Sequence, residues 1–148
     1  MLDAVPSSWL RSRPFGPRGV PALVLRIGAG APLVLIGVGK FVDRASEVRD
    51  FRSFGVPVPA VAVPLAGAIE VLGGLAVVIG LLTRPAALLV AANLVGALLT
   101  AGVREGGTFH LVVGPVLMIA MLVIAFVGPG PLSVDARILS RRSPPDTR

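Results

Sequence analysis

The segment VAVPLAGAIEVLGGLAVVIGLL, residues 61–82, carries one ionisable side chain, Glu70, in an otherwise apolar run. A helix of about 17–25 predominantly apolar residues is long enough to cross the hydrocarbon core of a bilayer. Three further segments have the same character: Val20–Gly39, Pro85–Val103 and Phe109–Val127. The sequence therefore predicts four transmembrane helices.

The composition supports this class of protein. Hydrophobic residues make up 54% of the 148 residues and charged residues 15%, and the mean hydropathy is +0.86. Soluble domains are about 45–50% apolar and about 25% charged. We therefore expect an all-α integral membrane bundle of four transmembrane helices. The absence of cysteine excludes disulfides, thiolate catalysis and iron–sulfur ligation.

The expected organisation has three parts. Residues 1–19 form a basic amino tail, residues 20–130 the transmembrane domain (20–39, 61–82, 85–103 and 109–127), and residues 131–148 a basic, partly disordered carboxyl tail. The first apolar run is too long for a signal peptide, so none is expected. The loop Phe41–Ala60 places Phe51 and Phe54 among charged residues, which predicts a short helix at the outer membrane interface.

Basic residues predict the orientation. Eight lie on the side of the tails: Arg11, Arg13, Arg18, Arg84, Arg137, Arg141, Arg142 and Arg148. Five lie on the opposite side: Lys40, Arg44, Arg49, Arg52 and Arg104. The positive-inside rule then places both termini in the cytoplasm. The same distribution explains the net charge of +6 without nucleic acid as a partner. The Arg-, Ala- and Gly-rich composition suggests a bacterial cytoplasmic membrane.

Among the polar residues of the predicted helices, Arg26, Glu70 and Asn93 stand out. Helical rise puts them at similar depths, and small residues at four-residue spacing accompany each, which is typical of closely packed membrane helices. We expect them to meet inside the bundle. They could form a buried pair that fixes the helix register, with Asn93 satisfying a remaining donor. The alternative is that they line a polar pocket for a quinone head group, a substrate or a proton.

Other residues receive simpler predictions. Lys40 and His110 are expected at the outer interface, where a lysine extends to the headgroups and a histidine contacts water. Gly30, Gly73 and Gly74 are expected to pack helices together. One histidine without cysteine is a poor basis for a metal site or a bound haem, so we expect neither metal nor covalent cofactor, with a quinone as the candidate ligand. A redox enzyme that acts without partners is therefore not expected.

Several motifs resemble the DoxX-like family. They are LRIGAG at 25–30, GVGKF at 37–41, AGAIEVLGG at 66–74, GLLTR at 80–84 and GPGPLSVD at 128–135. The resemblance implies a four-helix membrane bundle associated with redox systems, since some relatives are subunits of thiosulfate:quinone oxidoreductases. Arg26, Lys40, Glu70 and the pair Gly73–Gly74 match recurrent positions of that family, whereas His110 does not.

Three functions follow from these observations. The first is a small subunit or accessory factor of a quinone-linked membrane redox system, with the bilayer and other redox proteins as partners. The second is a membrane scaffold or assembly protein without chemistry of its own, and homo-oligomers fit either function. The third is a small carrier or proton pathway built on Glu70. The family resemblance favours the first.

Overall fold

A computed structural model describes residues 6, 9, 11 and 19–142 of the chain, so the predicted amino tail and residues 143–148 lie almost entirely outside the described residues. The described part is helical and contains no strand. Its elements are α2 (Val20–Val42), α3 (Arg44–Ser53), α4 (Pro59–Ile79), α5 (Thr83–Ala97), the π-helical segments η2 (Leu98–Gly102) and η3 (Phe109–Val113), α6 (Gly114–Val127) and α7 (Val134–Arg142).

Four continuous helices are long and apolar enough to cross a membrane: Val20–Val42, Pro59–Ile79, Thr83–Gly102 and Phe109–Val127. The predicted all-α membrane bundle is confirmed. Its boundaries differ in detail, because α2 continues three residues beyond Gly39 and α4 ends earlier than expected. Gly80, at φ +75°, terminates α4 in the left-handed conformation that glycine adopts without steric cost.

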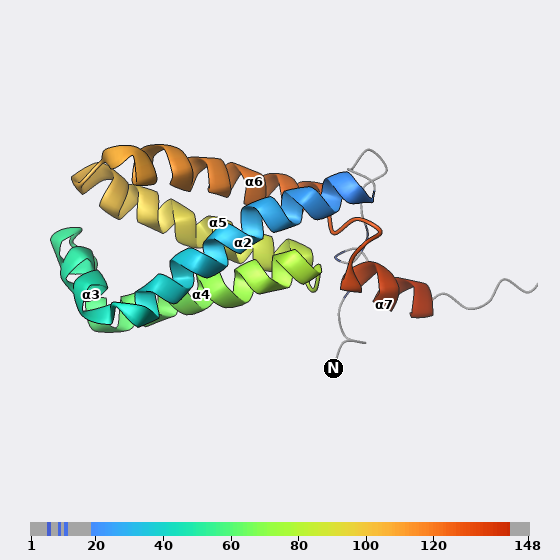
Figure 1. Ribbon diagram of the computed structural model, residues 1–148, viewed down its shortest axis with the longest axis horizontal. Helices are drawn as coiled ribbons and strands as arrows, with labels where there is room; N and C mark the ends of the chain where they lie inside the picture. Colours follow the sequence, from blue (N-terminus) through green and yellow to red (C-terminus); the bar gives the residue numbers. More distant parts are fainter. Residues whose placement is uncertain (1–5, 7–8, 10, 12–18, 143–148) are drawn as a thin grey trace, which may run out of the picture.

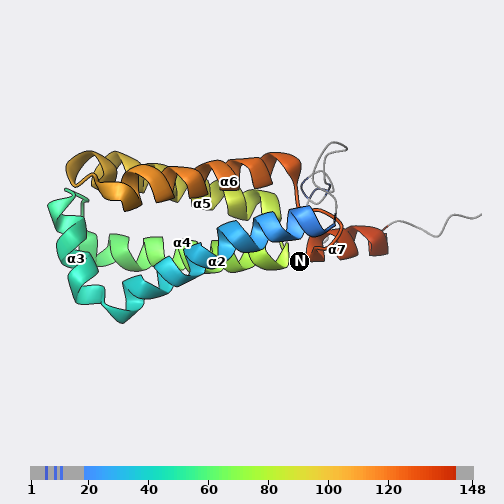
Figure 2. The same cartoon turned by 45° about the horizontal axis from the view of Figure 1, so that its top comes forward.

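The four helices are arranged as two pairs. α2 lies along α4 and α5 lies along α6, and the pairs separate toward the end that α3 crosses, as both views show (Figure 1, Figure 2). α7 lies at the opposite end, where α2 begins (Figure 1). The α3 end and the α7 end thus differ in how closely the pairs approach.

Glycines allow α2 and α4 to touch. A Cβ on Gly30 would lie 2.8 Å from the Gly74 carbonyl oxygen, and a Cβ on Gly74 would lie 2.8 Å from the Gly30 carbonyl oxygen. Gly73 faces α5, where its Cβ would lie 2.4 Å from Val90 Cγ2. At these three positions there is room for a hydrogen atom but not for a side chain. Small residues allow close packing of membrane helices in this way.

The apolar core occupies the half of the bundle nearer α7. Leu33, Val77, Val90 and Met121, one from each long helix, have no exposed surface. Most other span residues face outward, since only 22–39% of each apolar window is buried. Such outward apolar side chains contact the lipid bilayer.

The chain after α6 packs against the bundle instead of leaving it at residue 131. Asp135 is fully buried and accepts hydrogen bonds from Leu82 N (2.8 Å) and from Thr83 N (2.9 Å) and Oγ1 (2.8 Å). These backbone donors open the first turn of α5, which lacks a cap of its own. A side chain some fifty residues downstream therefore caps this helix.

Candidate functional site

A buried polar group of three residues joins α2, α4 and α5. Lys40 Nζ donates to Glu70 Oε2 at 2.8 Å, and Asn93 Nδ2 donates to Glu70 Oε1 at 3.1 Å. Lys40 is 8% exposed and Glu70 is 3% exposed. Both oxygens of the carboxylate are therefore occupied, which is what keeps an ionised group at this depth tolerable.

Lys40 was expected at the headgroups, and that prediction is wrong because the ammonium turns into the bundle. Helical side chains point toward the amino end of their own helix, so Lys40, near the carboxyl end of α2, extends back toward the middle. Gly37, one turn earlier, lies against the Cβ of Glu70, where its own Cβ would come within 2.8 Å. The close contact of α2 and α4 brings the lysine within reach of the carboxylate.

Arg26 does not join Glu70 and Asn93, so the expected cluster of three is wrong in this member. It precedes Lys40 by fourteen residues, about 21 Å along α2, and its side chain points away from the bundle centre. Its Nη2 donates to the Leu132 carbonyl oxygen beside Gly80, and Asp135 is the nearby acidic group that acts on it electrostatically. Arg26 is 1% exposed and secures the carboxyl segment at the α7 end.

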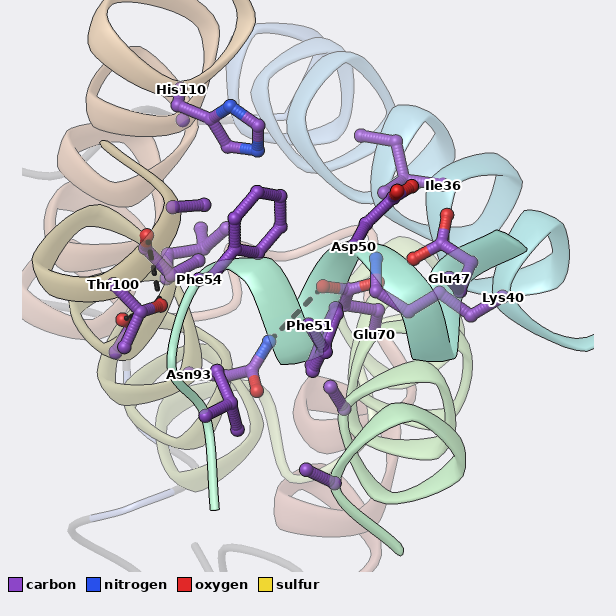
Figure 3. Close-up of a pocket in the computed structure, with 18 of the residues that line it drawn as sticks. Ile36, Lys40, Glu47, Asp50, Phe51, Phe54, Glu70, Asn93, Thr100 and His110 are labelled. Carbon is purple, nitrogen blue, oxygen red and sulfur yellow. Dashed lines mark hydrogen bonds and ion pairs between the residues drawn. The ribbon is translucent and has the colours of Figure 1, made fainter. Parts of the chain in front are cut away.

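A cavity of about 710 Å³ lies above Glu70, and we call it the α3-end cavity. Its walls come from α2, α4, α5, η2, η3 and the start of α6, and α3 crosses over it with Phe51 and Phe54 turned inward (Figure 3). Phe54 is buried there, so the predicted loop helix exists but directs this aromatic residue into the bundle. The volume falls within the range of about 300–1,000 Å³ that is typical of small-molecule sites.

The charged residues that line the cavity are mostly acidic. Glu47, Asp50 and Glu105 join Glu70, against Lys40 as the basic counterpart (Figure 3). The cavity is therefore electronegative and favours neutral or cationic ligands over anions.

His110 also lines the α3-end cavity, at its rim. Its Nδ1 lies 3.3 Å from the Gly106 carbonyl oxygen and 3.7 Å from Glu105 Oε2. Its ring makes edge contacts with Phe54 and Phe109. The histidine thus links α3 to the π-helical start of the fourth span.

Both π-helical segments in the described chain lie at this cavity. η2 contributes Leu98, Thr100 and Ala101, and η3 contributes Phe109 and His110. Thr100 Oγ1 donates to the carbonyl oxygens of Gly96 (2.8 Å) and Ala97 (3.3 Å). Such segments widen a helix locally and often occur at functional sites, and no apolar pattern in the sequence marks them in advance.

The donor set decides which ligands the cavity can hold. Lys40 donates one of its N–H groups to Glu70, and its other N–H groups can donate to a ligand. The Oδ1 of Asn93 has no hydrogen-bond partner in the described part of the chain and can accept from a ligand. The wall can therefore both donate and accept a hydrogen bond within a largely apolar lining. Among residues 19–142, no group of three acidic or histidine side chains is arranged to hold a metal ion.

One feature of the sequence sets Lys40 apart from the other basic residues. Lys40 is the only lysine among fourteen basic residues. A compact ammonium suits a single buried carboxylate, whereas a guanidinium presents five N–H groups that all need partners.

Three known proteins are similar to this chain, and two of them are named as membrane proteins. The putative oxidoreductase CatD of Bacillus subtilis is 28% identical over 116 residues, covering 78% of this chain and 85% of the relative. The inner membrane protein YphA of Escherichia coli is 30% identical over 129 residues, covering 81% of this chain and 91% of the relative. The uncharacterized membrane protein Rv3486 of Mycobacterium tuberculosis is 28% identical over 139 residues, covering 83% of this chain and 85% of the relative.

No solved structure matches this chain. The DoxX family model matches residues 22–103, more than half of the sequence and the whole of the part that supplies Lys40, Glu70 and Asn93. The chain therefore belongs to the DoxX family of membrane proteins.

Proposed function

We propose that the α3-end cavity holds the head group of a membrane quinone, and that the chain is a small subunit or accessory factor of a redox system in the bacterial cytoplasmic membrane. One observation carries this proposal: an intramembrane cavity of about 710 Å³ with Lys40, Glu70 and Asn93 joined in its wall. Polar groups inside a membrane are costly and usually mark functional positions.

The polar wall suits both redox states of a quinone. A quinone carbonyl can accept a hydrogen bond from Lys40 Nζ, and a quinol hydroxyl can donate one to Asn93 Oδ1. The apolar lining matches the ring and its substituents. A neutral ring also avoids the repulsion that the cavity carboxylates would exert on an anion such as thiosulfate. If the system oxidises such an anion, we expect that reaction on a partner.

A partner must also supply or take up the electrons. The chain has no cysteine and one histidine, so it cannot provide the thiolates of an iron–sulfur cluster or two histidine ligands of a haem. The similar protein CatD is named a putative oxidoreductase, which supports a redox setting for this chain as well. We therefore expect a soluble or membrane-bound redox protein as the partner.

The arrangement argues against a carrier. A transport path would have to continue from Glu70 toward the α7 end, where Leu33, Val77, Val90 and Met121 are fully buried and packed together. In the described bundle, this apolar cluster lies between Glu70 and the α7 end.

Purification with a matched pair of variants tests the proposal. The protein is isolated in mild detergent, and the ratio of bound quinone to phospholipid is measured by mass spectrometry. We expect enrichment over the membrane ratio in the wild type and in Ala92→Leu, which alters an exposed neighbour on α5, but not in Asn93→Leu. Equal ratios in all three proteins, with co-purifying proteins unchanged, would favour a scaffold and refute the quinone site.

A further inference from the structure

The α3-end cavity has a side that faces the lipid. Leu65 of α4 lines the cavity and is nevertheless 59% exposed, and Gly96 of α5 lines it and is exposed too. Each lies six residues inside its span, about 9 Å from the end by helical rise. Exposed residues at that depth border the hydrocarbon core.

The opening arises because α4 and α5 diverge. They pack together at Gly73, where a Cβ would lie 2.4 Å from Val90 Cγ2, and they remain joined by the hydrogen bond between Glu70 and Asn93. Beyond that bond they separate toward the α3 end (Figure 1, Figure 2). At Gly96, one helical turn past Asn93, a Cβ would meet no atom within 4 Å. The gap therefore begins immediately above the polar wall.

We propose that this gap, the α4–α5 portal bordered by Leu65, Ala66, Gly96 and Ala97, admits a ligand dissolved in the membrane and leaves its long apolar tail in the lipid. The inference rests on the proposed function, because the head group at Asn93 is taken to be a quinone. To the proposed function the portal adds a route of entry from the membrane, and it requires that the space beside Gly96 stay open for the tail. The acidic part of the lining, formed by Glu47, Asp50 and Glu105, does not hold the tail, because an apolar chain gains no hydrophobic burial against charged side chains.

Two ligands with one head group separate the portal from the pocket. The first is the dimethoxy-methyl-benzoquinone head with a ten-carbon tail, and the second is the same quinone without a tail. Gly96→Leu places a branched side chain in the portal. Gly28→Leu is its matched control, because Gly28 is also an exposed helical glycine whose Cβ would meet nothing within 4 Å, and it does not line the cavity.

Dissociation constants are measured on the full chain in lipid nanodiscs. We expect wild type and Gly28→Leu to bind both ligands, and Gly96→Leu to lose affinity for the tailed quinone by at least about tenfold while its affinity for the tail-less quinone changes less than about twofold. Equal losses for both ligands, or no loss for either, would overturn the portal. Failure of wild type to bind even the tail-less quinone would instead overturn the proposed function.

A second pair of variants keeps the test independent of one substitution. Leu65→Trp narrows the portal from α4, whereas Leu72→Trp alters a residue of the same helix that is 67% exposed and does not line the cavity. The same selective loss of the tailed quinone is expected for Leu65→Trp and not for Leu72→Trp. Identical behaviour of the two tryptophan variants would contradict the portal.

Discussion

The buried Lys40–Glu70 pair predicts a large, measurable coupling. Lys40→Met leaves the Glu70 carboxylate, 3% exposed, with Asn93 as its remaining partner. Glu70→Gln leaves the ammonium of Lys40, 8% exposed, without its ion-pair partner. Removing one member of a buried pair costs about 3–5 kcal/mol in the free energy of unfolding. The double variant buries neither charge, and the introduced amide can still accept from Asn93. We expect it to be about 2–3 kcal/mol more stable than the sum of the single effects predicts.

The assay is reversible unfolding by SDS titration in mixed micelles, with helical circular dichroism as the signal. A second cycle, Arg26→Met with Glu70→Gln, is the control, because Arg26 lies at the level of Gly80, ten residues or about 15 Å from Glu70 along α4. That cycle should be additive within about 0.5 kcal/mol. An additive Lys40–Glu70 cycle, or coupling confined to Arg26 and Glu70, would refute the reasoning.

Three further predictions concern packing, capping and topology. Gly74→Ala should lower the free energy of unfolding by about 1–3 kcal/mol, because its methyl group would lie 2.8 Å from the Gly30 carbonyl oxygen. Gly28→Ala, whose Cβ would meet no atom within 4 Å, should change it by less than about 0.5 kcal/mol in the same SDS titration. Asp135→Ala should lower the free energy of unfolding by about 2 kcal/mol, because three donors at the start of α5 lose a buried acceptor. Asp43→Ala, which removes an exposed cap, should lower it by about 0.5 kcal/mol, and equal effects of the two variants would contradict this assignment. The excess of basic residues on the side of the tails predicts that both termini face the cytoplasm, so that a carboxyl-terminal alkaline phosphatase fusion stays inactive and a green fluorescent protein fusion fluoresces.

The positions of the four membrane helices could be predicted from the sequence because they depend on local properties. Run length and the near absence of charge decide which segments enter a bilayer, and neither depends on distant contacts. The short helix between the first two spans was predictable for a similar reason, since Phe51 and Phe54 stand among charged residues that favour an interface. Gly30, Gly73 and Gly74 were identified as packing residues because small side chains are what permit close helix contacts.

The partners of the buried polar residues depended on the tertiary structure. The depth estimated from the helix boundaries predicted Arg26 beside Glu70. Lys40 lies there instead, because the contact of Gly30 with Gly74 sets the register of α2 against α4. Side chains of α2 also point toward its amino end, which directs Lys40 toward Glu70. The burial of Asp135 beneath α5 likewise needed a segment from the far end of the chain. The cavity arises from the divergence of two helix pairs, which no single segment encodes. Residue types and hydrophobic runs thus determined what enters the membrane, whereas helix register and the approach of the helix pairs decided which polar groups meet and where space remains for a ligand.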